Sequence, residues 1–336
     1  MKKAFLANLI IILSLICGCG AFGNELTERS SFAFDTFITI SDEGHSDTYY
    51  NNLFVTIGML EDKLSVTKAD SEISRLNREK ELTPSKEVYE IIEKAVEASK
   101  LTGGAFDITS CPYVETWGFT TKEYRVPKEE ELEAISKKVG FENIELSDGK
   151  VILKNDATID LGGIAKGYLG DMLADIKGDE TAIISLGGNI RVIGRKKDGS
   201  LWKIGIADPK SPSEIMGYLQ VEDTNIVTSG GYERFFYGND DEMYWHIIDP
   251  ASGKPAKNGI ISVTVIGKDG TMCDALSTGL FVMGEEKVKE FYQNNSDYEL
   301  VIVTEDDRIL LSEGIEEFFV SSGNTKRQVE VITKNK

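Results

Sequence analysis

The most informative stretch of the chain is residues 157–167, Ala157-Thr158-Ile159-Asp160-Leu161-Gly162-Gly163-Ile164-Ala165-Lys166-Gly167, which precedes the change from a helix-rich to a strand-rich half after residue 180. An apolar, strand-like run ends beside Asp160, two glycines follow, and an amphipathic helix then begins, with Ile164, Leu169, Met172, Leu173 and Ile176 on its inner side. Such a turn presents backbone N–H and C=O groups beside a helix N-terminus, which suits a phosphorylated ligand and a metal ion. The same residues also fit a tight turn that needs glycine only for its shape.

Helices dominate the half before this turn. The clearest one covers residues 84–101, where Thr83 can cap the helix and Pro84 suits its first turn. Two more helices are predicted at 49–64 and 128–139, and a single strand at 32–41. The inner face of helix 84–101 is formed by Val88, Ile91, Ile92, Ala95 and Val96.

Short apolar or alternating runs dominate after residue 180, and turn signals such as Asp198-Gly199 and Asp249-Pro250 separate them. One helical stretch, 274–293, interrupts these runs. Because regular βαβ alternation is absent, the pattern predicts an α+β fold with substantial antiparallel sheet. The predicted strands are 181–186, 190–194, 201–207, 215–222, 225–229, 233–237, 243–248, 260–267, 299–304, 308–312 and 317–320.

The composition limits the classes of partner. The chain has 336 residues, 41% of them hydrophobic, which predicts one large domain or two lobes with a sizeable core. Its net charge of −19 argues against binding nucleic acid or an anionic membrane surface, since both require basic patches. A polyanionic ligand must therefore be held locally, by backbone N–H groups, a few lysines or a cation.

The N-terminal residues resemble a bacterial lipoprotein signal. Lys2 and Lys3 precede a short apolar stretch, and Ile16-Cys17-Gly18-Cys19 places a small residue before a cysteine. We expect residues 1–18 to be a signal peptide, Cys19 to carry lipid on the extracytoplasmic side of the cell membrane, and residues 19–30 to form a tether. An ordinary signal peptide with an incidental cysteine is the alternative. The remaining thiols, Cys111 and Cys273, lack metal-type spacing and are expected to be free and buried.

Histidine is scarce, because only His45 and His246 occur. A histidine-based zinc site is therefore excluded, and a metal must be a hard ion bound by oxygen, hence Mg²⁺ or Ca²⁺. His45 lies in a polar loop and is expected to be solvated. His246 is either a partly buried structural residue or a general base.

Two further segments carry candidate chemistry. In Thr102-Gly103-Gly104-Ala105-Phe106-Asp107-Ile108-Thr109 the glycines fit a helix C-cap, yet Phe106 can also stack on a ring whose N–H groups Asp107 accepts. Asp274 and Thr278 are separated by one helical turn, and both carry oxygen suited to Mg²⁺. The alternative is an Asp that caps its helix and a Thr that bonds back to a carbonyl.

Taken in order, these pieces resemble the ApbE family of FAD:protein FMN transferases. The resemblance implies one two-lobed α+β domain over residues 31–325, with mixed, largely antiparallel sheets and flanking helices, followed by a polar tail at 326–336. It also implies that FAD binds with its pyrophosphate on Mg²⁺, that a Thr or Ser hydroxyl of a partner protein takes the FMN, and that AMP leaves. The matching segments are 70–77, 102–109, 160–168, 185–189, 228–230, 246–250 and 274–278.

The family's motifs imply roles for individual residues. Asp274, Thr278 and the carbonyl of Gly163 resemble the metal ligands, and His246 resembles the base that takes the hydroxyl proton. The residues that resemble FAD contacts are Phe34, Thr67, Ala105, Phe106, Asp107, Asp160, Lys166 and Ile248.

Three positions depart from the family pattern. Thr67 stands where many members carry an aromatic Tyr, which leaves the balance between FMN transfer and FAD hydrolysis open. Phe34 stands where Met is common, and Asp35 where Gly is common. The alternatives to a transferase are an FAD pyrophosphatase that gives FMN and AMP, and a non-catalytic flavin-binding lipoprotein.

Overall fold

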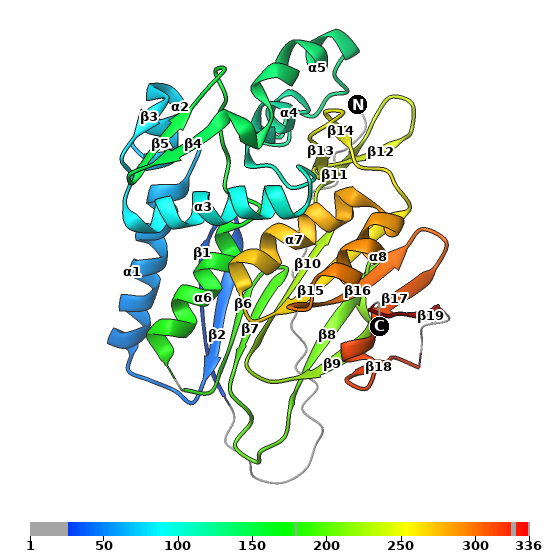
Figure 1. The fold of residues 1–336 in the computed structure, drawn as a ribbon. Helices are drawn as coiled ribbons and strands as arrows, with labels where there is room; N and C mark the ends of the chain where they lie inside the picture. Colours follow the sequence, from blue (N-terminus) through cyan, green and yellow to red (C-terminus); the bar gives the residue numbers. More distant parts are fainter. Residues whose placement is uncertain (1–25, 179, 324–326, 335–336) are drawn as a thin grey trace.

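The computed structural model describes residues 26–178, 180–323 and 327–334. The expected signal peptide and Cys19 therefore lie outside the described residues. One large sheet joins the two halves of the chain in the order β1-β2-β6-β7-β10-β15-β16-β17-β19, and only the pair β17–β19 is parallel (Figure 1). Its strands are β1 Thr27–Ala33, β2 Thr36–Asp42, β6 Ala182–Leu186, β7 Asn189–Ile193, β10 Thr224–Gly230, β15 Ile260–Gly267, β16 Tyr298–Thr304, β17 Arg308–Ser312 and β19 Gln328–Ile332.

Helices cover one face of this sheet and a second sheet covers part of the other. Neighbouring strand residues point to opposite faces, so Ile184 packs on the helix side while Ile183 packs against Trp202 and Leu219 of the second sheet. The second sheet has the order β18-β9-β8, from β8 Trp202–Asp208, β9 Ser211–Val221 and β18 Phe319–Ser321. The larger helices are α1 Asp47–Leu64, α3 Lys86–Leu101, α6 Ala165–Lys177, α7 Gly270–Met283 and α8 Glu285–Asn294.

Smaller elements complete the molecule. A three-stranded sheet and two short hairpins lie outside the large sheet. None of the helices in the described part of the chain combines the length and the apolar character that crossing a membrane requires. The remaining elements are α2 Glu72–Glu79, α4 Cys111–Thr116, α5 Glu129–Ile135, β3 Glu81–Leu82, β4 Ile144–Ser147, β5 Lys150–Leu153, β11 Phe235–Tyr237, β12 Met243–Trp245, β13 Ile248–Asp249 and β14 Lys254–Pro255.

Residues 32–41 form a hairpin rather than the single strand predicted. Phe34 and Asp35 make a two-residue turn between β1 and β2, and both have positive φ, 53° and 57°. A turn of this kind matches the twist of the flanking strands, and Asp tolerates the left-handed region better than most residues. Glu61 of α1 accepts a hydrogen bond from the Phe34 N–H at 2.7 Å, which fixes the turn.

Both predicted boundaries of the domain were wrong. Residues 27–30 of the expected tether belong to β1, where Thr27 pairs with Asp42. Residues 328–332 of the expected polar tail form β19, which pairs with β17 in parallel register. In both cases a polar edge strand needs only one apolar face, so its composition resembles that of a tail.

Several helices begin or end differently from the prediction. Ser85 rather than Thr83 is the N-cap of α3, so Pro84 precedes the helix, while the predicted inner face is buried. Residues 157–161 pair with no strand; instead the side-chain amide of Asn77 bonds to both backbone groups of Ile159, at 2.7 and 2.8 Å. On α6, Leu169 and Leu173 are buried as predicted, but Ile176 is 47% exposed.

The remaining helix predictions were partly right. The predicted helix at 128–139 is α5 followed by a 3-10 turn at 136–138, and Leu132 is buried. The predicted stretch 274–293 divides at Gly284, whose φ of 80° ends α7 before α8 begins. The two cysteines Cys111 and Cys273 are free and buried, as predicted.

Candidate active site

A cavity of about 540 Å³ collects the predicted site residues from across the chain. The β1–β2 turn, the loop after α3, the N-terminal end of α6 and α7 all contribute to its wall. The predicted residues that line it are Phe34, Ala105, Phe106, Asp107, Asp160, Gly163, Lys166, His246, Ile248, Asp274 and Thr278. A second cavity of about 600 Å³, beside the β13–β14 hairpin, is lined by none of them.

The closest contact in the site is the crossing of α6 and α7. Gly167 approaches α7 so closely that a Cβ atom on it would lie 2.1 Å from the carbonyl oxygen of Gly270. The Gly167 N–H, one of the free donors in the first turn of α6, donates to Oδ2 of Asp274 at 2.8 Å. Asp274 therefore lies inside α7 and caps α6, while Asp269 caps α7 itself. The predicted alternative, an N-cap role for Asp274 in its own helix, was wrong.

Oxygen donors meet beside this crossing. Oδ1 of Asp274 is 4.0 Å from Nζ of Lys166. The Thr278 hydroxyl is 3.2 Å from the hydroxyl of Ser229 on β10, and a Cβ on Gly163 would lie 3.9 Å from it. No group of three or more His, Cys, Asp or Glu side chains in the described ranges could hold a metal ion. One carboxylate, one hydroxyl and a glycine carbonyl fit a hard ion such as Mg²⁺, which takes its remaining ligands from phosphate and water.

The loop after α3 is shaped by its glycines and by Thr102. Gly103 and Gly104 have φ of 60° and 84°, and the Thr102 hydroxyl accepts the N–H of Phe106 at 3.0 Å. Oδ1 of Asp107 accepts both the N–H and the hydroxyl of Thr109, at 2.8 and 2.6 Å. Burial raises the pKa of Asp107 although these bonds oppose the rise. The C-cap and the ligand role predicted for this loop are therefore compatible.

Asp160 and Lys166 flank the glycine turn at the cavity wall. One oxygen of Asp160 accepts the Gly162 N–H at 2.8 Å, and burial raises the pKa of this carboxyl. Lys166 is half-buried and faces Asp274. The turn thus places a carboxyl group and a lysine on either side of two glycines, as its sequence indicated.

His246 is fixed in one tautomer. Its Nδ1 is 3.2 Å from the carbonyl oxygen of Arg234, which can only accept a hydrogen bond, so Nδ1 carries the proton. The lone pair of the neutral ring is then on Nε2. Burial lowers the pKa of His246 to about 3, and the charges of Arg234 and Lys166 lower it as well, so the ring is neutral at physiological pH.

Three cavity residues were missed by sequence reasoning. Glu233 and Arg234 lie three and four residues after the 228–230 motif, and Asn189 ends the 185–189 motif, but neither motif suggested a role for them. Loss of solvation on the cavity side raises the pKa of Glu233 to about 7, although the residue as a whole stays exposed; Lys166 and Arg234 oppose the rise and Asp274 adds to it. Within the described residues, the buried Nδ2 of Asn189 has no hydrogen-bond partner, which leaves a donor for a ligand.

Two predicted residues are placed differently from what the sequence indicated. Thr67 is not among the residues that line the cavity; its hydroxyl is 3.0 Å from the hydroxyl of Ser65 in the loop after α1. His45 is not simply solvated. Its ring stacks on Tyr49 at 4.1 Å, and its Nε2 is 2.9 Å from Glu180.

Known proteins share both the sequence and the fold. The sequence model of the ApbE family matches residues 34–302. An FAD:protein FMN transferase of Vibrio cholerae serotype O1 is 36% identical over 257 residues, which cover 73% of this chain and 76% of that protein. The enzyme of the same name from Escherichia coli K12 is 30% identical over 277 residues, covering 78% and 79% of the two chains.

Two solved structures agree closely with this fold. The crystal structure of the ApbE protein from Thermotoga maritima has a TM-score of 0.80 at 33% identity and covers 88% of this chain and 99% of that one. The flavin transferase ApbE from Vibrio cholerae has a TM-score of 0.79 at 30% identity, with the same coverage. The match extends over most of the sequence and over the α+β architecture, and the chain belongs to the ApbE family.

Proposed function

We propose that this chain transfers FMN from FAD to a Thr or Ser hydroxyl of a partner protein, with Mg²⁺, and releases AMP. The observation that carries the proposal is the cavity, which combines hard oxygen donors, two cations and a neutral imidazole. Relatives with the name FAD:protein FMN transferase support it.

The chain's own residues have separate tasks in this reaction. Lys166 and Arg234 offset the charge of the pyrophosphate, which a protein of net charge −19 must do locally. Phe106 offers a ring for stacking on the isoalloxazine, and the second oxygen of Asp107 accepts an N–H from it. The side-chain amide of Asn189, whose Nδ2 is buried without a partner in the described residues, donates a hydrogen bond to the bound FAD.

Asp274, Thr278 and the Gly163 carbonyl would hold Mg²⁺. When bound, the ion neutralises charge on the pyrophosphate and on the leaving AMP. Asp274 is the only carboxylate of this set, so it carries the charge that a hard cation requires.

His246 takes the proton of the acceptor hydroxyl on Nε2. The hydroxyl oxygen forms a bond to the FMN-side phosphorus, the bond from that phosphorus to the bridging oxygen breaks, and AMP leaves with that oxygen. An isolated imidazole with a pKa of about 3 is a weak base. The negative pyrophosphate offsets the charges of Lys166 and Arg234 and so makes the ring more basic in the complex.

The test is incubation of the protein with FAD, MgCl₂ and a Thr-containing acceptor protein. Covalent flavin fluorescence on the acceptor supports the transferase, free FMN and AMP without acceptor indicate a hydrolase, and unchanged FAD with tight binding indicates a carrier. Asp274→Asn, which keeps an oxygen acceptor for the Gly167 N–H but removes the charge, is expected to fold and to lose Mg²⁺-dependent turnover. Full activity in that variant with Mg²⁺ still required would contradict the metal assignment.

The hydrolase is the second candidate, and one observation favours it. Thr67 stands where many family members carry Tyr and does not line the cavity, so it adds no aromatic ring that would keep water from the wall. The ratio of free FMN to acceptor-bound FMN measures the balance.

Membrane attachment through Cys19 is part of the proposal. Its basis is the sequence Ile16-Cys17-Gly18-Cys19 after a short apolar stretch. Cys19→Ser is expected to move the protein from the membrane fraction to the soluble fraction, and an unchanged distribution would contradict lipid attachment at this residue.

A further inference from the structure

Two hairpins that contribute to the cavity wall each carry a pair of exposed aromatic rings. Phe32 and Phe37 lie directly opposite each other on β1 and β2, 61% and 68% exposed, with ring centroids 5.4 Å apart. The turn between them, residues 34–36, lines the cavity. The first pair therefore lies at one side of the cavity.

The second pair lies on β11. Phe235 and Tyr237 are 39% and 65% exposed, with centroids 5.7 Å apart. Residues 232–234, directly before β11, line the cavity, and so does His246, directly after β12. In both pairs, at most two residues of chain separate each aromatic residue from a residue that lines the cavity.

This arrangement accounts for most of the exposed aromatic surface. The described residues include six exposed aromatic side chains, Phe32, Phe37, Tyr124, Phe235, Tyr237 and Phe318, and four of these belong to the two pairs. Single exposed apolar residues are ordinary, but grouped ones mark interaction sites. Aromatic rings also carry much of the binding energy at protein interfaces.

We propose that the two aromatic pairs, Phe32–Phe37 and Phe235–Tyr237, form the docking surface for the acceptor protein. This inference rests on the proposed function and names where its second substrate binds. The acceptor hydroxyl must reach the inside of a cavity of about 540 Å³, which admits one side chain but no folded protein. The residues that flank the hydroxyl must then lie on the rim, where apolar side chains of an extended segment cover the rings.

A protein fits this surface better than a lipid bilayer does. A chain with net charge −19 is repelled by an anionic membrane surface. Contact with a protein substrate at the entrance of the site involves no comparable charge repulsion.

The test compares two double variants with a matched control. Phe32→Ser with Phe37→Ser removes the first pair, and Phe235→Ser with Tyr237→Ser removes the second. Val55→Ser with Met59→Ser is the control, because these α1 side chains are 62% and 60% exposed and do not line the cavity. The acceptor probe is the detergent-solubilised membrane fraction of the source cell, and the readout is the rate of covalent flavin incorporation into its fluorescent protein bands.

Each aromatic variant is expected to lower the rate about 10-fold at limiting acceptor, with recovery at high acceptor, as for loss of an interface anchor. FAD affinity, measured by flavin fluorescence, is expected to stay within about twofold of the wild type, since the rings lie outside the cavity. The control variant is expected to match the wild type in both measurements.

Four outcomes overturn the inference. Rates unchanged in both aromatic variants exclude docking there, and a parallel loss of FAD affinity shows that the rings support the cavity instead. If the aromatic variants lose binding to vesicles while the rate depends on acceptor concentration as in the wild type, the surface binds lipid. If they instead lose a dimer under the same condition, the surface binds a second copy of the chain. A wild-type protein that labels no acceptor overturns the proposed function itself, which separates that failure from failure of the docking surface.

Discussion

The proposed role of His246 as general base can be tested by comparing its substitution with that of His45, the other histidine of the sequence. His246→Ala removes the Nε2 lone pair, and transfer is expected to fall by about 10²–10⁴-fold, the usual contribution of a general base. FAD affinity is expected to change little. His45→Ala is the control, because His45 does not line the cavity. Single-turnover rates with FAD and acceptor check this, and equal rates in the two variants would remove His246 from the mechanism.

The raised pKa of Glu233 leads us to expect that FAD affinity depends on pH. The pKa of Glu233 is raised to about 7, so the carboxyl is neutral below pH 7 and becomes an anion in the cavity above it. FAD is also an anion, so its affinity in metal-free buffer is expected to fall as pH rises through about 7. Titrations of FAD from pH 5.5 to 8.5 test this. Glu233→Gln should give a flat profile over the same interval, and a persistent fall in that variant would assign the titration to another group.

At the residue scale, the site residues that could be predicted from the sequence are those whose side chains carry charge or a ligating oxygen. Asp274 and Thr278 carry oxygen at helical spacing, Lys166 carries charge beside the glycine turn, and the structure brings all three to one cavity. Asn189 and Glu233 could not be predicted, because the unpaired amide of Asn189 and the raised pKa of Glu233 arise from segments distant in the sequence. Thr67 was placed by its offset from the 70–77 motif, and an offset does not fix the direction of a loop.

At the element scale, the α6–α7 crossing predicts a strong effect of one methyl group. Gly167→Ala would place Cβ 2.1 Å from a backbone carbonyl, so the helices must separate. We expect a loss of at least about 2 kcal/mol in the free energy of unfolding, and weaker metal binding because Asp274 moves with α7. Gly58→Ala on α1, where nothing lies within 4 Å, should instead stabilise by about 0.5–1 kcal/mol. Denaturant unfolding of both variants decides between these expectations.

The elements themselves were predicted where one face is apolar and missed where it is not. Each predicted run after residue 180 contains a strand or part of one, because buried strands must be apolar. The β1–β2 turn was missed because Phe34-Asp35 lacks glycine and the apolar content continues through it. The segment 157–161, expected to be a strand, is apolar because it is buried, as a strand in the core would be. It pairs with no neighbouring strand; the side-chain amide of Asn77 takes the backbone hydrogen bonds of Ile159 instead.

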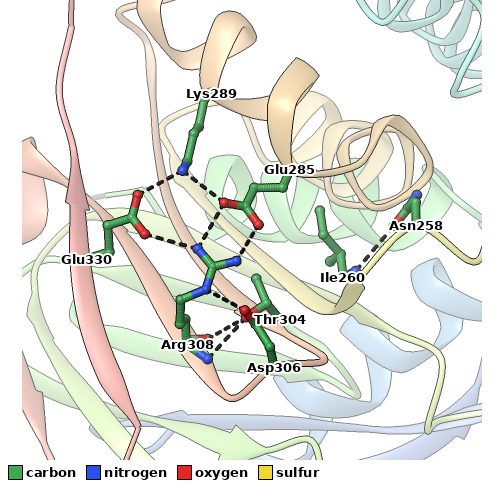
Figure 2. A network of polar contacts seen from close by, with 8 residues as sticks. All are labelled: Asn258, Ile260, Glu285, Lys289, Thr304, Asp306, Arg308 and Glu330. Atoms are coloured by element: carbon green, nitrogen blue, oxygen red, sulfur yellow. Dashed lines mark hydrogen bonds and ion pairs between the residues drawn. The ribbon is translucent and has the colours of Figure 1, made fainter.

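At the scale of the whole molecule, an ionic cluster fastens the last strand to the last helix. Figure 2 shows Arg308 of β17 between Glu285 of α8 and Glu330 of β19, with Lys289 bridging the two carboxylates. Arg308 bonds to Glu285 at 2.6 and 2.9 Å and to Glu330 at 3.0 Å. Three segments distant in the sequence are thus held by one guanidinium, which ties β19 to the sheet.

This cluster predicts a loss of acid stability on substitution. Arg308 holds the pKa of Glu285 at about 2, below its ordinary value of 4.5, so the stabilisation is complete above pH 4.5 and disappears as pH falls through 2. Arg308→Met keeps the apolar stem and is expected to cost about 1–2 kcal/mol at pH 7, with less further loss on acidification than in the wild type. Arg195→Met breaks a single exposed pair with Glu222 and is expected to cost less than Arg308→Met, because solvent screens the pair. Urea unfolding at pH 7 and pH 3 measures both, and equal losses would argue against a cooperative cluster.

The contact between Gly167 and α7 also has a thermodynamic consequence. The carboxylate that caps α6 is held by the Gly167 N–H and by the close packing of the two helices, and the hydroxyl one turn along α7 contacts the hydroxyl of Ser229. The donor set is therefore preorganised, and a cation pays little entropy to order it. For the proposed function, we therefore expect any cooperativity between Mg²⁺ and FAD to come from contact of cation and phosphate rather than from a rearrangement of this helix pair.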